Sequence, residues 1–232
     1  MLGRQSERGT DACIPILESG DRLTRCEFER RYAACPEIKK AELIEGIVYV
    51  SLPVRTNVHG DPHAALQGLL FLYAARTPRV RVGDNATVRL DLDNEPQPDT
   101  HLRIDKEAGG SSAISEDDYL EGAPELVAEL AASSASIDLH AKRNAYRRNG
   151  VQEYIVWRTI DSRIDWWELV DGDYVPLPAN EAGVIESHVF PGLRLATQAL
   201  LAGDLSAAVG VVEDGLRSSA HKAFCEAIDA AE

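Results

Sequence analysis

The chain has 232 residues, of which 44% are hydrophobic, and this length is sufficient for one domain with a full core. Its formal net charge of −14 argues against tight nonspecific binding to nucleic acid, because such binding requires a basic surface that replaces counterions on phosphates. An acidic total still allows a local basic strip, and a site that holds a metal ion between carboxylates is itself partly acidic.

The four cysteines show no C-x-x-C pair and no framework spacing, so we expect reduced thiols and no zinc site. They are Cys13, Cys26, Cys35 and Cys225. Residues 1–10 are polar and charged and lack the apolar segment of a secretory signal, and no uncharged stretch is long enough to cross a bilayer. The sequence therefore predicts a cytoplasmic protein that does not contact a membrane.

The N-terminal part predicts a lead-in, a short helix and a strand. Residues 1–20 lack periodicity, and we expect them to form a flexible lead-in. Thr24 followed by Glu27 resembles a capping box, which predicts a helix that extends to about Ala34. The apolar run at 47–50 predicts a strand that begins after a turn.

A second helix and a further strand precede the first candidate acid. Apolar residues at helical spacing predict a helix that begins at His59 and ends before Pro78. Alternation over 80–90 predicts a strand, which a turn connects to the next one. Residues 105–118 are rich in Gly, Ser, Asp and Glu, so we expect a long polar loop near the site.

The second half of the chain predicts a strand-helix-strand crossover, a hairpin and a helical tail. The crossover consists of a buried strand at 126–132, a helix at 137–149 that Gly150 stops, and a parallel strand at 154–157. Strand patterns at 164–170 and 174–175 flank Asp171-Gly172, which predicts a tight hairpin. Residues from Ala196 onward are helical in pattern.

Two acids lie on predicted strands. Asp99 opens a short strand whose two-residue period puts Asp99, His101 and Arg103 on one face, although a Pro-Asp turn at a strand start is an alternative role for Asp99. Glu129 lies inside an apolar strand, where an ionised carboxylate is costly unless something pairs with it. A metal ion, a lysine on the following helix or His101 could be this partner. Glu125, at the start of the same strand, is expected to be solvated.

The helix after the buried strand carries the densest basic cluster in the chain. Lys142 could orient a water or offset charge at a phosphate, whereas its spacing of four from Asp138 also fits a surface ion pair. The neighbouring arginines either grip phosphates or form a solvated helix face. They are Arg143, Arg147 and Arg148. His59 could cap its helix, bind substrate or lie in the core.

Several short motifs occur in a specific order between about Thr24 and Leu195. They are Glu45-Gly46, His59, Gln97-Pro98-Asp99, Gly122 to Val127 leading to Glu129, Asp138 to Lys142 to Tyr146, Gly150 to Tyr154, and Phe190 to Leu193. Together they resemble a large bacterial family of restriction endonucleases, the Uma family, within the PD-(D/E)xK nuclease superfamily.

The resemblance implies a core of a helix, three strands, a crossover helix and a further strand, with acids on the second and third strands that bind a divalent ion. Here those acids are Asp99 and Glu129, and the ion would be Mg²⁺ or Mn²⁺. The family pattern places a lysine two residues after the strand acid, where this chain has Ala131, and we nominate Lys142 as the substitute. Ala132-Ser133-Ser134 stands where the family usually has Ser-Pro-Ser/Thr.

We therefore expect an α/β (α+β) fold with a restriction-endonuclease-like core, in which helices flank a mixed central β-sheet. The expected division is a lead-in at 1–20, a nuclease domain at 21–195 and a helical tail at 196–232. Catalysis is assigned to Asp99, Glu129 and Lys142, of which Asp99 and Glu129 bind the metal ion. Substrate contacts are assigned to four further residues. They are His59, Arg103, Arg143 and Arg147.

The function expected from these residues is divalent-metal-dependent phosphodiester hydrolysis by an endonuclease that acts on DNA. A homodimer would let two sites address two strands. A catalytically inactive interaction or scaffold protein that keeps the nuclease fold is the alternative, favoured by the net charge of −14. A hydrolase that acts on a smaller phosphodiester is a third possibility.

Overall fold

A computed structural model describes residues 14–51 and 55–230, so most of the predicted lead-in lies outside the described residues. A six-stranded sheet with the order β11-β10-β9-β8-β5-β3 forms its centre. The strands are β3 (Val80–Asp84), β5 (Thr100–Ile104), β8 (Leu126–Ala131), β9 (Glu153–Arg158), β10 (Arg163–Val170) and β11 (Asp173–Pro176). β8 and β9 are parallel and the other neighbours are antiparallel, which confirms the predicted mixed sheet.

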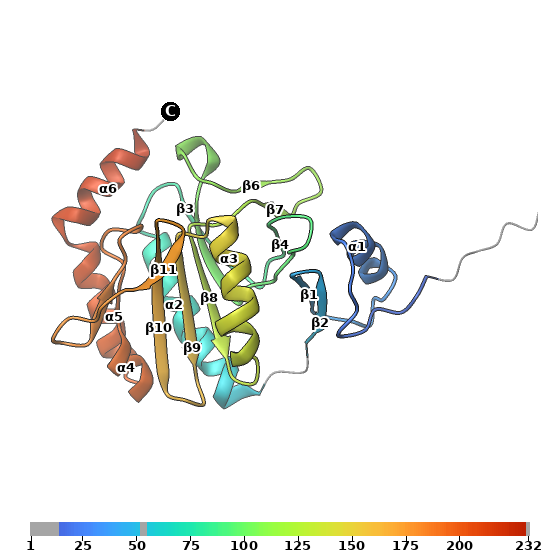
Figure 1. Cartoon of the computed structure of the whole chain (residues 1–232). Helices are drawn as coiled ribbons and strands as arrows, with labels where there is room; N and C mark the ends of the chain where they lie inside the picture. The colour runs from blue at the N-terminus through green and yellow to red at the C-terminus, as the bar shows by residue number, and fades with distance from the viewer. Residues whose placement is uncertain (1–13, 52–54, 231–232) are drawn as a thin grey trace, which may run out of the picture.

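Two helices cover opposite faces of this sheet (Figure 1). Leu126, Ala128 and Leu130 of β8 pack in the cluster that contains α2 (Asp61–Ala74). Val127 and Ala131 pack on the other side, with Tyr146 of α3 (Arg143–Asn149). The two-residue period of a strand therefore places Glu129, between Val127 and Ala131, on the face that α3 covers.

The crossover and the hairpin after it have the predicted form. The helical segment begins as a wide turn, η3 (Ile137–Lys142), continues as α3 and ends at Gly150, whose φ of 83° is left-handed. Between β10 and β11, Asp171 and Gly172 both have positive φ, 49° and 86°. Two such residues form the type I′ turn that matches the twist of a hairpin.

An N-terminal hairpin lies beside the main sheet and has a small core of its own, which includes Phe28, Leu43 and Val48. The hairpin is formed by β1 (Ala41–Ile44) and β2 (Ile47–Val50), and α1 (Arg25–Ala33) packs against it. Backbone hydrogen bonds of 2.8 and 3.1 Å between Leu43 and Glu95 attach β1 to the segment before β5. This attachment brings β1 towards the acids of the main sheet.

The helix α1 has the expected bounds, but the predicted capping box is wrong. Thr24 is the N-cap residue, and its side chain makes no capping hydrogen bond. Glu27 instead accepts hydrogen bonds of 2.7 Å from both Arg30 and Arg31. Two guanidinium groups three and four residues further along the helix offer stronger, charged donors than the Thr24 backbone N–H does.

The predicted polar loop contains short regular elements. They are η2 (Lys106–Ala108) and β6 (Ala113–Ile114), and β6 joins β4 (Val88–Arg89) and β7 (Leu120–Glu121) in a small sheet. Glu125 orders the start of this segment, since its carboxylate accepts the N–H groups of Ile104 and Ser111 at 2.7 Å each. It is 2% exposed, so the expectation that it is solvated is wrong.

The C-terminal part packs on the α2 side of the sheet. Its elements are β12 (Val184–Glu186), β13 (Arg194–Ala196), α4 (Thr197–Ala202), α5 (Leu205–Leu216) and α6 (Ser219–Asp229). Leu200, Val212 and Ile228 belong to the same buried cluster as Leu66 and Leu70 of α2. Within residues 14–51 and 55–230, none of the helices combines the length and the hydrophobicity that a bilayer crossing needs.

Candidate active site

Asp99 lies directly before β5 and is 5% exposed. Its Oδ2 accepts the backbone N–H of Leu130 at 2.8 Å, and its Oδ1 accepts the ammonium of Lys40 at 3.2 Å. The Nε2 of His59 lies 3.4 Å from Oδ2. Burial alone would raise the pKa of Asp99, but His59, Lys40 and the Leu130 N–H hold the pKa well below its ordinary value. Asp99 is therefore an ionised carboxylate.

Glu129 of β8 is 2% exposed, and its nearest basic group is Lys142. Its Oε1 accepts hydrogen bonds from Lys142 Nζ at 3.0 Å and from the Tyr146 hydroxyl at 2.8 Å. Its Oε2 lies 3.4 Å from the backbone nitrogen of Asp99, which donates to it. Burial raises the pKa of Glu129 to about 8, and the negative charge of Asp99 adds to the rise while Lys142 opposes it.

Lys142 ends η3 and is 4% exposed. Its ammonium lies 2.8 Å from Glu42, 3.0 Å from Glu129 and 3.7 Å from Asp138. Burial favours the neutral amine, but these carboxylates hold the pKa of Lys142 well above its ordinary value. The alternative of a surface ion pair with Asp138 is wrong, since the Asp138 side chain is only 3% exposed.

Helical spacing explains how one helix presents several groups to Glu129. Asp138, Lys142 and Tyr146 are each four residues apart, so they form one stripe that faces the sheet. The Tyr154 hydroxyl of β9 donates to the backbone carbonyl of Asp138 at 3.0 Å and fixes the start of this stripe. The sequence had suggested Asp138 only as a surface partner of Lys142, and Tyr146 only as a motif position.

Sequence reasoning missed two residues at the start of the N-terminal hairpin, Lys40 and Glu42. Lys40 contacts Asp99, and Glu42 contacts Lys142 and accepts the backbone N–H of Gln97 at 2.7 Å. For Glu42 the sequence did contain a signal of the kind that identified Glu129: it is a charged residue in a strand-like segment, next to Leu43 and Ile44. The two-residue period also puts Lys40 and Glu42 on one side of the strand.

His59 lies at the site, and a second histidine lies beside it. The helix predicted to begin at His59 begins instead as a wide turn, η1 (Thr56–Gly60), and α2 follows at Asp61. His63, one turn further on, has its Nε2 2.9 Å from the backbone oxygen of Asp99 and 3.1 Å from Asp84 Oδ1. The centroids of the two imidazole rings are 5.9 Å apart.

The predicted arginines are engaged elsewhere. Arg103 lies 3.4 Å from Asp105. Arg143 covers the ring of Trp167 at 4.9 Å and donates to the carbonyl of Tyr174, while Arg147 donates to the carbonyl of Gly172 at 2.7 Å. The helical segment thus directs Lys142 to the acids, and Arg143 and Arg147 to the β10–β11 hairpin. Arg148 pairs with Glu45 at 3.0 Å.

His101 is not the partner of Glu129. Its ring packs against Gly83, where a Cβ atom would lie 2.1 Å from the ring, and burial lowers the pKa of His101 to about 4. A neutral, enclosed imidazole cannot offset a carboxylate charge. Of the two protein partners considered for Glu129, the structure selects Lys142.

The donor set fits a hard divalent cation. When all are ionised, four carboxylates (Glu42, Asp99, Glu129 and Asp138) face two amines (Lys40 and Lys142), which leaves two uncompensated negative charges. Mg²⁺ is held by one or two carboxylates and keeps several waters. Among the described residues, no group of three or more His, Cys, Asp and Glu side chains could hold a metal ion by itself.

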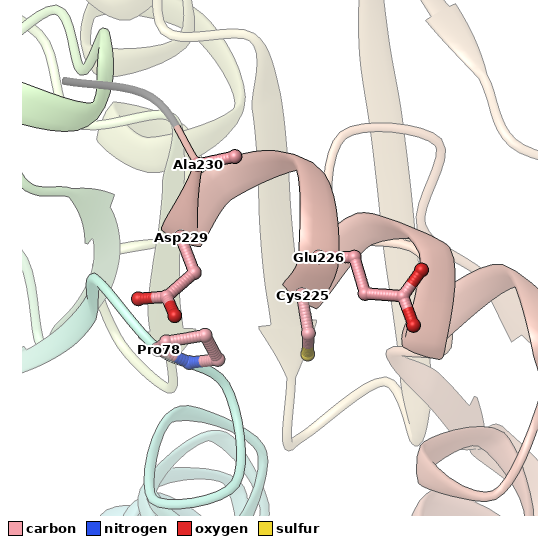
Figure 2. Close-up of a pocket in the computed structure, with 5 residues that line it drawn as sticks. All are labelled: Pro78, Cys225, Glu226, Asp229 and Ala230. Carbon is pink, nitrogen blue, oxygen red and sulfur yellow. The ribbon is translucent and has the colours of Figure 1, made fainter.

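A hollow of about 450 Å³ lies elsewhere, between Pro78 and the end of α6 (Figure 2). Its lining includes Cys225, Glu226 and Asp229, and none of its residues belongs to the acid cluster. Burial raises the pKa of the Cys225 thiol, and Asp229 adds to the rise, so this thiol is not an activated nucleophile.

Comparisons with known proteins identify the fold and the family. The crystal structure of "a putative nuclease belonging to DUF820" from Anabaena variabilis superposes with a TM-score of 0.54 at 12% identity, over 81% of this chain and 97% of that one. This likeness shows a restriction-endonuclease-like fold. Comparison with curated proteins gives no significant match. The model of the Uma2 family, described as "Putative restriction endonuclease", matches residues 27–198. The chain therefore belongs to the Uma2 family, as its motifs predicted.

Proposed function

We propose that this protein is a divalent-metal-dependent phosphodiester hydrolase that cuts DNA. One observation carries the proposal: two carboxyl groups, Glu129 of β8 and Asp99 directly before β5, meet in a buried cluster. The hydrogen bond from the Asp99 N–H to Glu129 ties the two acids together. Membership of the Uma2 family supports nuclease chemistry at this position.

In this proposal Asp99 and Glu129 hold Mg²⁺ or Mn²⁺, which supplies Lewis-acid polarisation of the phosphate and activation of a water. Each acid has its own orienting groups. The Leu130 N–H and His59 orient the Asp99 carboxylate, while Lys142 and Tyr146 orient that of Glu129. Lys142 also keeps positive charge beside Glu129, so that the carboxylate can remain ionised when the site is loaded.

Contacts with DNA are few in this proposal, because 24 basic residues against 38 acidic ones leave most of the surface repelling phosphate. His59 lies at the acids and is the predicted contact that the site geometry supports. Arg103, Arg143 and Arg147 would have to contact phosphates away from the cut, since their guanidinium groups lie at other acceptors. The homodimer and the cytoplasmic location remain predictions, which sizing in solution and cell fractionation would check.

The test is cleavage of labelled duplex DNA in Mg²⁺ and in EDTA by the wild type, Asp99→Asn and Glu129→Gln. We expect metal-dependent cleavage by the wild type and its loss in both variants, with all three proteins folded. Glu107→Gln is the matched control, because Glu107 is exposed on η2 and should cut as the wild type does. Full activity in either site variant would refute the assignment of these ligands.

One observation favours the second candidate, a scaffold protein without activity. Lys142 already contacts Glu129, and Ala131 occupies the position at which the superfamily pattern has its lysine. A scaffold would leave this ion pair undisturbed by metal. Melting the protein with and without Mn²⁺ separates the candidates: the nuclease requires a rise in melting temperature that Asp99→Asn abolishes, whereas the scaffold requires no rise.

A further inference from the structure

We propose that Lys40, rather than Lys142, is the amine that contacts the substrate phosphate. The inference rests on the proposed function and adds a residue that neither the motifs nor the family match assigns. Two lysines flank the pair of acids, one on each side. Their contacts and their exposure to solvent distinguish them.

Lys142 is enclosed by carboxylates. Those of Glu42, Glu129 and Asp138 lie 2.8, 3.0 and 3.7 Å from its nitrogen, and the first two distances are within hydrogen-bond range. Its side chain is 6% exposed, and Tyr146 contacts the same Glu129 oxygen. A phosphate could reach this nitrogen only by displacing a carboxylate, so Lys142 is a positioning residue for Glu129.

Lys40 differs in each of these respects. Its ammonium has two acceptors among the described residues, Asn85 Oδ1 at 3.0 Å and Asp99 Oδ1 at 3.2 Å, which leaves one N–H bond for a ligand. Its side chain is 24% exposed, whereas that of Asp99 is 7% exposed. Lys40 therefore lies between Asp99 and solvent, on the route by which a phosphate would approach the acids.

Two histidines contact Asp99 as Lys40 does. The side chains of His59 and His63 are 16% and 17% exposed, and both approach Asp99, one at its carboxylate and one at its backbone oxygen. A partly exposed ammonium with an unused N–H attracts a phosphate anion locally, although Asp99 offsets part of its charge, even in a chain whose total charge is −14. The alternative is a structural role, in which Lys40 only compensates the charge of Asp99.

In the proposed reaction Lys40 forms no covalent bond and loses no proton. Its free N–H donates to a nonbridging oxygen of the scissile phosphate, and the hydrogen bond strengthens as negative charge develops there. Asn85 and Asp99 hold the ammonium in place, so the donor is preorganised. Removal of one such donor typically lowers the rate about 10²- to 10³-fold.

The experiment separates contact with phosphate from compensation of Asp99. Binding of labelled duplex is measured in Mg²⁺ across several salt concentrations in the Asp99→Asn background, where position 99 carries no charge and the DNA is not cut. Adding Lys40→Met should weaken binding and lower the slope of log affinity against log salt by about 0.9, the value for one phosphate contact. Adding Lys39→Met is the matched control, because Lys39 is exposed and its ammonium donates only to the carbonyl of Pro36 within the described residues.

Cleavage rates complete the test with Asp99 intact. We expect Lys40→Met to cut at least about 10²-fold more slowly and Lys40→Arg to recover part of the rate, with Lys39→Met unchanged. An unchanged salt slope in the double variant, or wild-type cleavage by Lys40→Met, would overturn the role of Lys40 and leave the hydrolase intact. A wild type that binds through Lys40 without cutting would overturn the hydrolase alone. Absence of both binding and cutting would overturn both.

Discussion

Replacing Lys142 with Met tests how the buried acid cluster is held together. Methionine has a similar length, so the change removes the charge without opening a cavity, and it leaves Glu42, Glu129 and Asp138 without their common partner. Breaking a buried ion pair in this way costs about 3–5 kcal/mol, a large part of the ~5–15 kcal/mol that stabilises a domain. At about 2–4 °C per kcal/mol, the melting temperature should fall by roughly 6–20 °C.

The loss of unfolding free energy in Lys142→Met should also depend on pH. Burial raises the pKa values of Glu129 and Asp138, and Lys142 opposes the rise, so loss of the amine raises these pKa values further. The native state then keeps protons that the unfolded state releases, and stability is lost as pH rises. Urea unfolding of the wild type and Lys142→Met at pH 5 and pH 8 should show a small difference at pH 5 and the full difference at pH 8. Lys222→Met is the control, because the Lys222 side chain is 79% exposed. A loss below about 1 kcal/mol at pH 8, or an equal loss at both pH values, would refute the reasoning.

Three further predictions concern single positions. Glu129→Gln removes a carboxyl whose pKa is raised to about 8, so in metal-free buffer the variant should gain stability over the wild type between about pH 4.5 and pH 8, and equal stability of the two proteins at pH 8 would contradict this. Gly83→Ala would place a Cβ 2.1 Å from the buried His101 ring and should cost about 1–3 kcal/mol in chemical denaturation. Gly68→Ala, in an open position on α2, should instead stabilise the protein by about 0.5–1 kcal/mol.

Local sequence patterns predicted the strands of the sheet and singled out the two acids, because each of these predictions depends only on the residues of one short stretch of chain. The two-residue period of β8 placed Glu129 on one face, and the cost of a buried carboxylate required a partner. Lys142 became a candidate partner because the resemblance implies a lysine near the strand acid, and Lys142 lies on the helix that follows this strand. Its spacing from Asp138 also fitted a surface pair, and only the packing of α3 on the sheet distinguishes the two arrangements.

Patterns could not place the hairpin residues or the arginines. Lys40 and Glu42 lie far from Asp99 and Lys142 in the sequence, and no periodicity states where a hairpin attaches to a sheet. For the arginines, the sequence did not show which side of the helix faces the sheet. Arg143 follows Lys142 by about 100° around the helix, so its side chain projects to a neighbouring stripe when Lys142 faces the sheet.

The N-terminal hairpin also affects the order in which parts of the protein would unfold on heating. It packs in a small core of its own and contributes Lys40 and Glu42 to the site, so opening of this unit alone would dismantle the site. All three tryptophans lie in β9 and β10, within the main sheet, and fluorescence reports on that sheet only. DNA cleavage should therefore disappear several degrees below the tryptophan transition, and amide exchange should show Leu43 and Val48 exposed to solvent in that interval.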